Sequence, residues 1–145
     1  VALFDERAER LARQFWPGPL TLVLPLRPGA GVAPAVTAGL PTIAVRVPDH
    51  PAMQALLRET GLPLAAPSAN RSGGVSPTQA AHVVASLGEA VDAVIDAGEC
   101  RRGLESTIAA VRADGSWQLL RPGPVTVSEL ASLLGPPRAL ADAAI

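Results

Sequence analysis

Small polar residues are concentrated in the segment A-A-P-S-A-N-R-S-G-G-V-S-P, at residues 65–77. Hydroxyls, an amide and two glycines follow a short apolar stretch and precede a predicted helix. Residues without bulky side chains let backbone N–H groups approach a phosphate or a carboxylate closely. The same residue types also dominate ordinary turns, so a plain loop that ends in a helix cap is the alternative interpretation.

Arg46 is the single charge in the apolar stretch T-I-A-V-R-V, at residues 42–47. A guanidinium inside a buried strand is costly unless it is paired, and its planar fork can hold a carboxylate through two parallel hydrogen bonds. Its partner is either a ligand or a carboxylate of the chain. The acidic candidates are Asp49, Asp92, Asp96 and Glu105.

Two further segments could contribute to a binding site. G-L-E-S-T, at residues 103–107, is a turn that brings two hydroxyls to the start of a predicted strand, and L-R-P-G, at residues 120–123, ends the next strand. Arg121 there either is a solvated strand end or contacts a phosphate. His50 is expected near a helix start, with a role as catalytic base as the alternative. We predict no covalent nucleophile and no metal site built from protein side chains.

Helix signals position these residues. Four helices are predicted from three- and four-residue apolar spacing and from capping residues. The first follows the cap Asp5 and ends before Pro17. The others are capped by Asp49, by Ser76 with Gln79, and by Thr126 with Glu129, and they end at Gly61, Gly88 and Gly135.

Strand signals alternate with these helices. β-branched and apolar runs predict strands at residues 20–26, 42–47, 62–66, 91–97, 106–112 and 117–121, with a hairpin turn at 113–116. The segments 28–41 and 98–103 are predicted loops. An α/β fold with a twisted, mixed and partly antiparallel sheet follows from this order.

Composition limits the class of protein. The chain has 145 residues, 48% hydrophobic and 17% charged, which predicts one globular domain. The 13 acidic and 12 basic residues nearly cancel, which argues against strong binding to a polyanion. The longest apolar run is interrupted by Pro25 and is too short to span a membrane. The single cysteine, Cys100, fits a reducing cytoplasm, and we therefore expect a cytoplasmic protein.

Six collinear segments resemble the YrdC-like family of L-threonylcarbamoyladenylate synthases. They are F-W-P-G-P-L-T-L-V-L (15–24), T-I-A-V-R-V-P-D-H-P (42–51), P-L-A-A-P-S-A-N-R-S-G (63–73), S-P-T (76–78), G-L-E-S-T-I (103–108) and L-R-P-G (120–123). The resemblance implies a YrdC-like fold, in which helices flank a mixed sheet around a concave cavity. It also implies a nucleotidyltransferase that makes threonylcarbamoyl-AMP and pyrophosphate from L-threonine, bicarbonate and ATP, with Mg²⁺ carried by ATP.

Residue roles follow from the same resemblance. Arg46, the backbone at Ala66 and the Ser106 hydroxyl would bind threonine. Asn70 would support the loop or the magnesium-phosphate group. The nucleotide contacts would come from Thr42, Ser68, Ser76 and Arg121. A separate complex would then transfer the threonylcarbamoyl group to tRNA.

The resemblance also marks what this chain lacks. The family's N-terminal part, which contacts threonine and the triphosphate, has no counterpart, so we expect weakened nucleotide binding and poor or no synthesis by the chain alone. Residues 1–137 are expected to form the domain, and residues 138–145 the start of a linker or tail. Two alternatives stand beside the synthase: a domain of hydrogenase maturation that makes a carbamoyl adenylate, and a non-catalytic module that binds double-stranded RNA or tRNA.

Overall fold

The structure is a computed structural model that describes residues 1–100 and 104–139. The chain divides into two compact units. We call residues 1–54 together with residue 104 onwards the sheet unit, and residues 55–103 the loop unit. The end of the predicted loop at 98–103 and most of the predicted tail at 138–145 lie outside the described residues.

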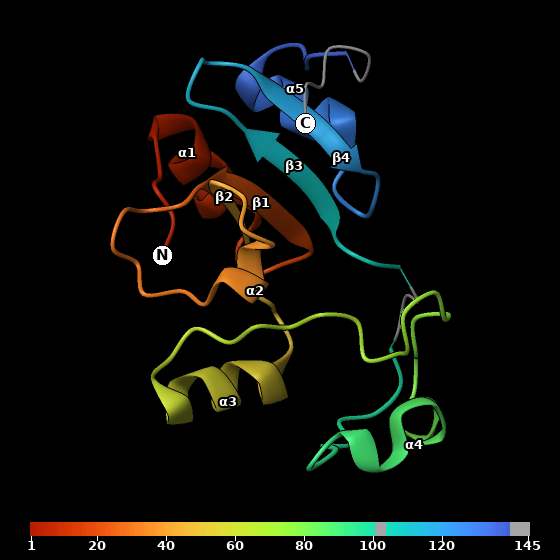
Figure 1. The fold of residues 1–145 in the computed structure, drawn as a ribbon. Coiled ribbons are helices and arrows are strands. Elements are labelled where there is room, and N and C mark those ends of the chain that lie inside the picture. The colour runs from red at the N-terminus through yellow and green to blue at the C-terminus, as the bar shows by residue number, and fades with distance from the viewer. Residues whose placement is uncertain (101–103, 140–145) are drawn as a thin grey trace. The chain divides into compact units, whose positions relative to one another are not determined.

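The sheet unit is built on four strands, β1 (Leu20–Pro25), β2 (Thr42–Val45), β3 (Thr107–Val111) and β4 (Trp117–Arg121). Their order in the sheet is β2-β1-β3-β4 (Figure 1). β1 and β3 run parallel, whereas β2 and β4 pair antiparallel with their neighbours. The predicted mixed, partly antiparallel sheet is therefore confirmed.

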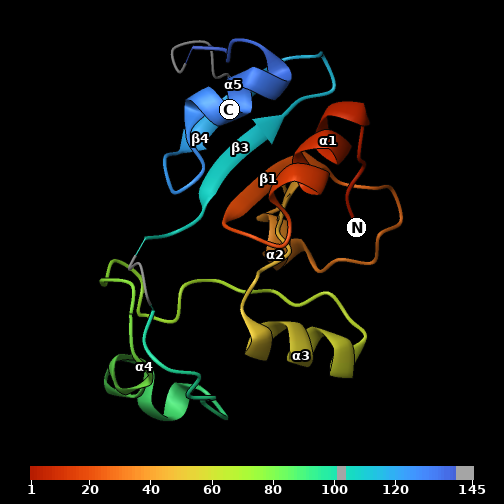
Figure 2. The ribbon, with the colours of Figure 1, turned by 180° about the vertical axis from the view of Figure 1, so that it is seen from behind.

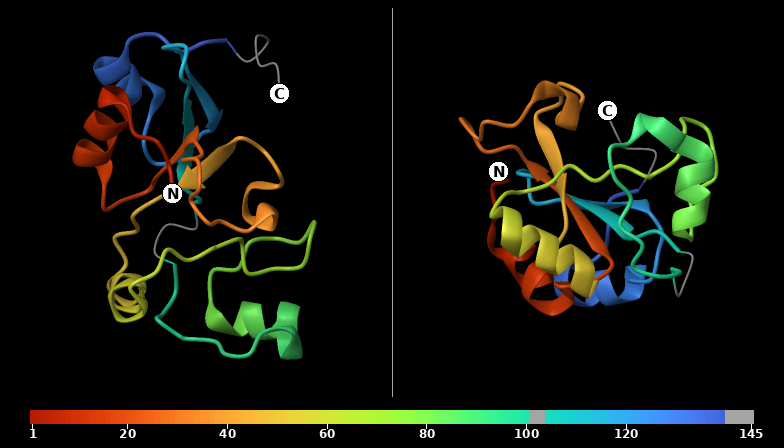
Figure 3. Two further views of the ribbon diagram at one scale, coloured as in Figure 1. Left: turned by 60° about the vertical axis from the view of Figure 1, so that its left-hand side comes forward. Right: turned by 90° about the horizontal axis from the view of Figure 1, so that it is seen from below.

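Two helices cover one face of this sheet. α1 (Glu6–Phe15) and α5 (Val127–Leu134) lie on the same side of the strands, as Figure 2 shows from behind and Figure 3 shows from the side. Leu11 of α1 and Leu130 of α5 are fully buried against alternate residues of β1. Alternation along a strand sends every second side chain to one face, so Leu20, Leu22 and Leu24 enter this core.

The other face of the sheet carries the intervening residues. In β1, Thr21 and Val23 are half-buried between the buried leucines. The register places Val23 opposite Ala44 of β2 and Ala110 of β3, so these three side chains share a face. This second face ends at the polar residues described below.

The predicted caps of the two core helices are confirmed. Asp5 Oδ1 accepts a hydrogen bond of 2.9 Å from the Ala8 amide. Thr126 and Glu129 form a capping box, with Thr126 Oγ1 accepting from the Glu129 amide and Glu129 Oε2 accepting from the Thr126 amide. The bonds from the Thr126 amide and hydroxyl hold the pKa of Glu129 below its usual value.

The hairpin between β3 and β4 is also confirmed. The Arg112 amide donates to the Ser116 carbonyl, and Asp114 Oδ1 accepts from the Ser116 hydroxyl and amide. These bonds lower the pKa of Asp114. The short polar turn thus sets the pairing of two neighbouring strands.

Three predictions for the sheet unit and for the start of α3 need correction. The segment 28–41 is not all loop, because Pro34 at the first helical position begins the short helix α2 (Pro34–Thr37). The strand predicted to Val47 ends at Val45, after which pairing with β1 stops. In α3 (Pro51–Thr60) the cap is His50 rather than Asp49, since His50 Nδ1 accepts from the Ala52 amide at 3.2 Å.

The loop unit contains the rest of α3, then α4 (Ala80–Leu87) and the 3₁₀ turn η1 (Gly88–Ala90). The strands predicted at 62–66 and 91–97 are wrong, because neither segment pairs with another strand. Most of their apolar residues stay exposed, with Leu62 at 64% and Ile95 at 71%. α4 ends at Gly88 as predicted but begins at Ala80, with Gln79 making no side-chain cap, so the expected capping box from Ser76 is wrong.

No described helix could cross a membrane. The longest, α1 and α3, have 10 residues each, whereas a span needs roughly 20.

Candidate functional site

Polar residues gather where the first residues of β1 and β3 meet the last residues of β2 and β4. Leu20 pairs with Thr107, Leu22 with Val45, and Ile108 with Arg121. This register brings four residues that are distant in sequence to one end of the sheet. We call Thr21, Arg46, Ser106 and Arg121 the polar edge.

Ser106 lies at the centre of the polar edge, and its exposed fraction is only 7%. Its Oγ is 2.7 Å from Thr21 Oγ1 and accepts a hydrogen bond of 3.1 Å from Arg121 Nη2. Its carbonyl accepts from Arg121 Nε at 3.0 Å and Nη2 at 2.8 Å. Both the hydroxyl and the backbone of Ser106 are therefore held in place.

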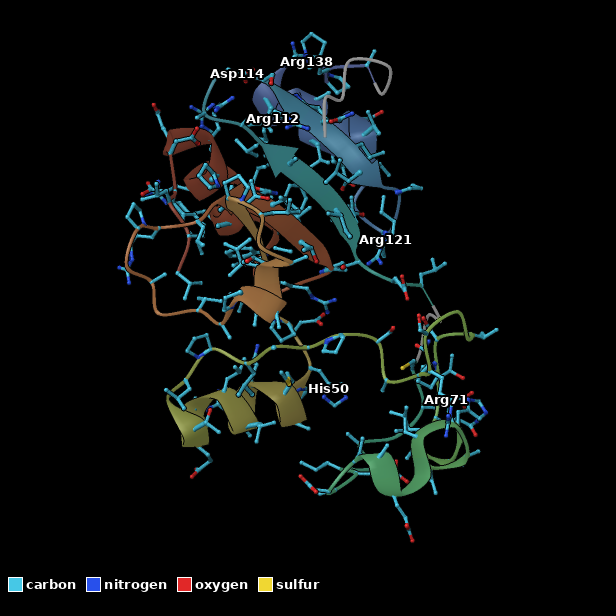
Figure 4. The ribbon with its side chains drawn as sticks, in the orientation of Figure 1. His50, Arg71, Arg112, Asp114, Arg121 and Arg138 are labelled. Atoms are coloured by element: carbon cyan, nitrogen blue, oxygen red, sulfur yellow. The ribbon has the colours of Figure 1, made fainter. Side chains whose placement is uncertain are left out.

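Arg121, the last residue of β4, lies at the same end of the sheet (Figure 4), and its guanidinium donates to the Ser106 carbonyl. A third nitrogen, Nη1, forms an ion pair with Glu105. The Arg121 side chain is 38% exposed, so this pair is open to solvent and adds little stability. The guanidinium organises the entry to β3 and keeps one side accessible.

A close backbone contact fixes the turn that follows Arg121. Thr107 Oγ1 donates to the Val125 carbonyl at 2.8 Å and accepts from the Val125 amide at 2.9 Å. Gly123 packs closely against the backbone of residues 105–107. A Cβ atom at Gly123 would lie 2.5 Å from the Thr107 backbone nitrogen and 2.8 Å from the Glu105 carbonyl oxygen. Only glycine fits this position without displacing the backbone beside Ser106.

Arg46 lies directly after Val45, the last paired residue of β2, and is exposed. Just beyond it, the Gly18 amide donates to the Val47 carbonyl at 2.9 Å, which ties this segment to the residues before β1. Among the described residues of the sheet unit, none forms a hydrogen bond or ion pair with its guanidinium. The expectation of a charge inside a strand is therefore wrong, and the internal ion pairs with Asp49 and Glu105 are not formed. The other two candidates, Asp92 and Asp96, belong to the loop unit, and a pair with them stays a prediction.

Thr42 lies at the opposite end of β2. It pairs with Pro25, the last residue of β1, whereas Arg46 follows the partner of Leu22. Thr42 and Arg46 are four residue steps of extended backbone apart, or about 13 Å. The structure does not bring Thr42 to the polar edge.

The other predicted site residues belong to the loop unit. Asn70 closes the loop on itself, because its Nδ2 donates to the carbonyls of Arg71 at 2.8 Å and Gly74 at 3.2 Å. Arg71 Nε donates to the Ser86 carbonyl of α4 at 2.9 Å. Asn70 Oδ1 is buried, and no described residue donates to it. The remaining candidates are exposed at the surface of this unit: Ala66, Ser68 and Ser76.

Two participants were missed from the sequence. Thr21 reads as one polar residue in a leucine-rich strand, and its alternation with Leu20 and Leu22 is the signal that places it on the non-core face. Glu105 was considered only as a partner of Arg46, but it pairs with Arg121. His50 caps α3, and within the loop unit the Cys100 amide donates to the Thr78 carbonyl.

Within residues 1–100 and 104–139, no group of three or more His, Cys, Asp or Glu side chains is arranged to hold a metal ion. At the polar edge the nearest carboxylate contact is Glu105, which is already paired with Arg121. A divalent cation here would need further oxygen ligands from a bound molecule, such as phosphates.

Comparison with known proteins gives the family. A family model for Sua5, YciO and YrdC proteins, described as "Telomere recombination", matches residues 1–123. The threonylcarbamoyl-AMP synthase of Bacillus subtilis is 50% identical over 131 residues, and that of Pyrococcus abyssi is 46% identical over 133 residues. In both cases the match covers 90% of this chain but 37% of the relative, so the chain spans little more than a third of their length.

Solved structures agree with this assignment. The crystal structure of P. abyssi Sua5 complexed with L-threonine matches with a TM-score of 0.86 and 43% identity, over 94% of this chain and 39% of that one. Escherichia coli YciO matches with a TM-score of 0.76 and 25% identity, over 89% of this chain and 62% of that one. The predicted YrdC-like fold is confirmed, and the chain belongs to the Sua5/YciO/YrdC family.

Proposed function

We propose that this chain is the nucleotidyltransferase part of a threonylcarbamoyl-AMP synthase, which joins L-threonine, bicarbonate and ATP and releases pyrophosphate. The observation that carries the proposal is the exposed guanidinium of Arg46, which pairs with no described residue of the sheet unit and lies at the same end of the sheet as the fixed Ser106 hydroxyl. An accessible guanidinium can bind a carboxylate through two parallel hydrogen bonds, and an amino acid supplies such a carboxylate. Relatives named threonylcarbamoyl-AMP synthase support the reaction class.

The amino acid occupies the sheet side of the site in this proposal. Arg46 holds the threonine carboxylate through two parallel hydrogen bonds, and Ser106 contributes its hydroxyl. The resemblance to the family assigns a third contact with threonine to the backbone at Ala66, in the loop unit. Because strands set the positions of Arg46 and Ser106, the two groups are ready before substrate arrives.

In this proposal the nucleotide is contacted by residues of the small-residue loop at 65–77 and by residues at the strand ends. Ser68 and Ser76 offer hydroxyls without bulk, and Asn70 supports the loop by closing it through the Arg71 and Gly74 carbonyls. Arg121 meets a phosphate on its exposed side, where the phosphate competes with Glu105 for Nη1. Thr42, at the far end of β2, contacts a part of the nucleotide distant from the threonine carboxylate.

The chemistry needs positioning and charge stabilisation more than a reactive side chain. The threonine amine attacks CO2 and loses a proton, or attacks bicarbonate and releases water, to form a carbamate. A carbamate oxygen then attacks the α-phosphorus, and the bond to pyrophosphate breaks as pyrophosphate leaves. Mg²⁺ bound to the ATP phosphates would neutralise their charge. Arg46 and Ser106 hold the attacking molecule, and Arg121 stabilises negative charge near the nucleotide.

We place the product in tRNA modification, in the cytoplasm. Threonylcarbamoyl-AMP is a mixed anhydride of a carbamate and a phosphate, so it can pass its threonylcarbamoyl group to an adenosine amine. A separate transfer complex carries out that step. With 13 acidic and 12 basic residues, the chain has no overall field to hold tRNA, so any contact with tRNA or double-stranded RNA is local.

Calorimetric titration of L-threonine with ATP and Mg²⁺ present tests the proposal. Arg46→Ala should weaken threonine binding roughly 10- to 100-fold, because a hydrogen-bonded charge contributes about 1.5–3 kcal/mol. Arg13→Ala is the matched control, since Arg13 is 80% exposed on α1, the helix that covers the other face of the sheet. Equal affinity of Arg46→Ala and the unaltered chain contradicts the assignment of the carboxylate site.

Mass spectrometry of the products separates the alternatives. Threonylcarbamoyl-AMP that forms only with threonine supports the synthase. A carbamoyl adenylate that forms without threonine supports the hydrogenase-maturation activity instead. Steeply salt-dependent RNA binding without any ATP binding supports the RNA-binding module.

A further inference from the structure

The hydrogen bond between Thr21 and Ser106 has a direction that the neighbouring arginine constrains. Ser106 Oγ is bonded to two side chains, Thr21 Oγ1 at 2.7 Å and Arg121 Nη2 at 3.1 Å. A guanidinium has donors and no acceptor, so Ser106 Oγ must accept from Arg121. One lone pair and one proton of the Ser106 hydroxyl then remain for other partners.

Two arrangements of the protons satisfy these distances. If Ser106 donates to Thr21, its only proton is used inside the protein. If Thr21 donates to Ser106, both lone pairs of Ser106 Oγ are filled, and its O–H can donate to a ligand. In the second arrangement the Ser106 hydroxyl can only donate, so it favours an acceptor such as a carboxylate or carbonyl oxygen.

The backbone holds Thr21 rigidly enough to control this choice. Thr21 lies between Leu20 and Leu22, which are both fully buried in the core. A threonine side chain in a strand has restricted χ1 freedom, so its hydroxyl keeps a fixed position on the non-core face. Among the described residues, Ser106 is the only hydrogen-bond partner of Thr21 Oγ1.

We propose that Thr21 is a positioning residue for the amino-acid substrate: its hydroxyl donates to Ser106 Oγ and thereby directs the Ser106 proton to an acceptor oxygen of the bound amino acid. The proposal rests on the proposed function, in which Ser106 belongs to the threonine pocket. Thr21 acts through Ser106 and does not itself contact the substrate. Arg46 supplies charge to the carboxylate, whereas the pair Thr21–Ser106 supplies a neutral, directed donor.

The deciding experiment compares Thr21→Val with Thr21→Ser. Valine keeps the shape of threonine and removes the hydroxyl, whereas serine keeps the hydroxyl. Thr21→Val should weaken threonine binding about five- to tenfold in calorimetry, the loss expected for one neutral hydrogen bond, and Thr21→Ser should bind within about twofold of the unaltered chain. Calorimetric titration of ATP should give an unchanged affinity for both variants.

A double-mutant cycle with Ser106→Ala checks that the effect passes through Ser106. In the Ser106→Ala background, Thr21→Val should cause no further loss. Additive losses, or equal losses of threonine and ATP affinity, overturn the inference because they indicate a general structural role. If thermal unfolding shows that Thr21→Val does not fold, Thr21→Ala replaces it as the variant without a hydroxyl.

The outcomes also separate this inference from the proposed function. If the unaltered chain and Thr21→Val bind threonine equally, the role of Thr21 is wrong and the synthase proposal stands. If the unaltered chain binds no threonine in the presence of ATP and Mg²⁺, the proposed function fails, and the inference fails with it.

Discussion

The sheet unit and the loop unit are stabilised in different ways. In the sheet unit, leucines of β1 are fully buried beneath α1 and α5, and four strands share a continuous ladder. Among residues 55–100 of the loop unit, no side chain is fully buried, and the backbone is held by local polar contacts from Asn70, Arg71 and His82. Half of the candidate site residues therefore lie on a packed framework and half on a polar, exposed segment.

This difference separates a rigid framework from a segment that opens easily. Arg46, Ser106 and Arg121 are placed by strand pairing, so their spacing is set by the core. Ser68 and Asn70 are placed by hydrogen bonds within a loop, and segments with few buried apolar contacts open at low free-energy cost. We expect amide hydrogens of the loop unit to exchange well before those of β1 and β3.

The largest expected effect comes from paired leucine substitutions. Leu22→Ala removes a fully buried side chain from β1 and should lower the free energy of unfolding by about 2–5 kcal/mol. Leu62→Ala, at a residue 64% exposed in the loop unit, should change it by less than about 0.5 kcal/mol. Urea unfolding measures both. Similar losses at the two positions would contradict the contrast between the units.

Glycine substitutions sharpen the comparison at the backbone level. Gly123→Ala would place Cβ 2.5 Å from the Thr107 nitrogen, and relief of this clash should cost about 1–3 kcal/mol and displace Ser106. Gly74→Ala in the loop unit meets the Arg71 carbonyl at 3.0 Å, which a small loop shift relieves. Thermal unfolding together with threonine titration should show losses of stability and affinity for Gly123→Ala alone. A well-folded, fully binding Gly123→Ala would refute this account of the turn.

Helix caps provide a smaller contrast. Thr126→Ala removes the capping box of α5 and should cost about 1 kcal/mol. Gln79→Ala alters the N-cap of α4, where no side-chain cap is made, and should change the free energy of unfolding by less than about 0.5 kcal/mol. Chemical denaturation of both variants is the measurement. A larger loss for Gln79→Ala would show that α4 is capped after all.

The smallest expected effect is a pH dependence from the same capping box. Hydrogen bonds from Thr126 lower the pKa of Glu129 in the folded chain, so the folded state favours its ionised form. This stabilisation is present above the usual pKa of a glutamate and is lost as the pH falls below it. Unfolding curves at neutral and acidic pH should show the loss, and Glu129→Gln should reduce it. An unchanged pH profile in Glu129→Gln would contradict this role.

Sequence reasoning succeeded where local signals and burial agree. β1 combines a run of apolar residues with Pro25 as its end, and α5 combines apolar spacing with the Thr126 cap, so both were predicted close to their observed bounds. It failed at 62–66 and 91–97, where apolar residues resemble strands but find no strand to pair with. Strand formation depends on a partner, which a local pattern does not contain.

The candidate site divides in the same way. Residue types along the chain marked Arg46, Ser106 and Arg121 as candidates with alternatives left open, and the family resemblance assigned their roles. They did not show that Arg121 clamps Ser106, that Thr42 lies at the far end of β2, or that Thr21 meets Ser106. Each of these depends on which residues face one another across strands.

The amino-acid sequence by itself determined the mixed α/β class, the helix caps of the core and the kinds of groups available for binding. Those features follow from periodicity, capping residues and side-chain chemistry, which act over a few neighbouring positions. Only the tertiary structure decided the register between β1, β2 and β3, and with it the grouping of Thr21, Arg46 and Ser106. A shift by one residue would turn Thr21 into the core and leave Ser106 without its partner, because side chains alternate between the two faces of a sheet.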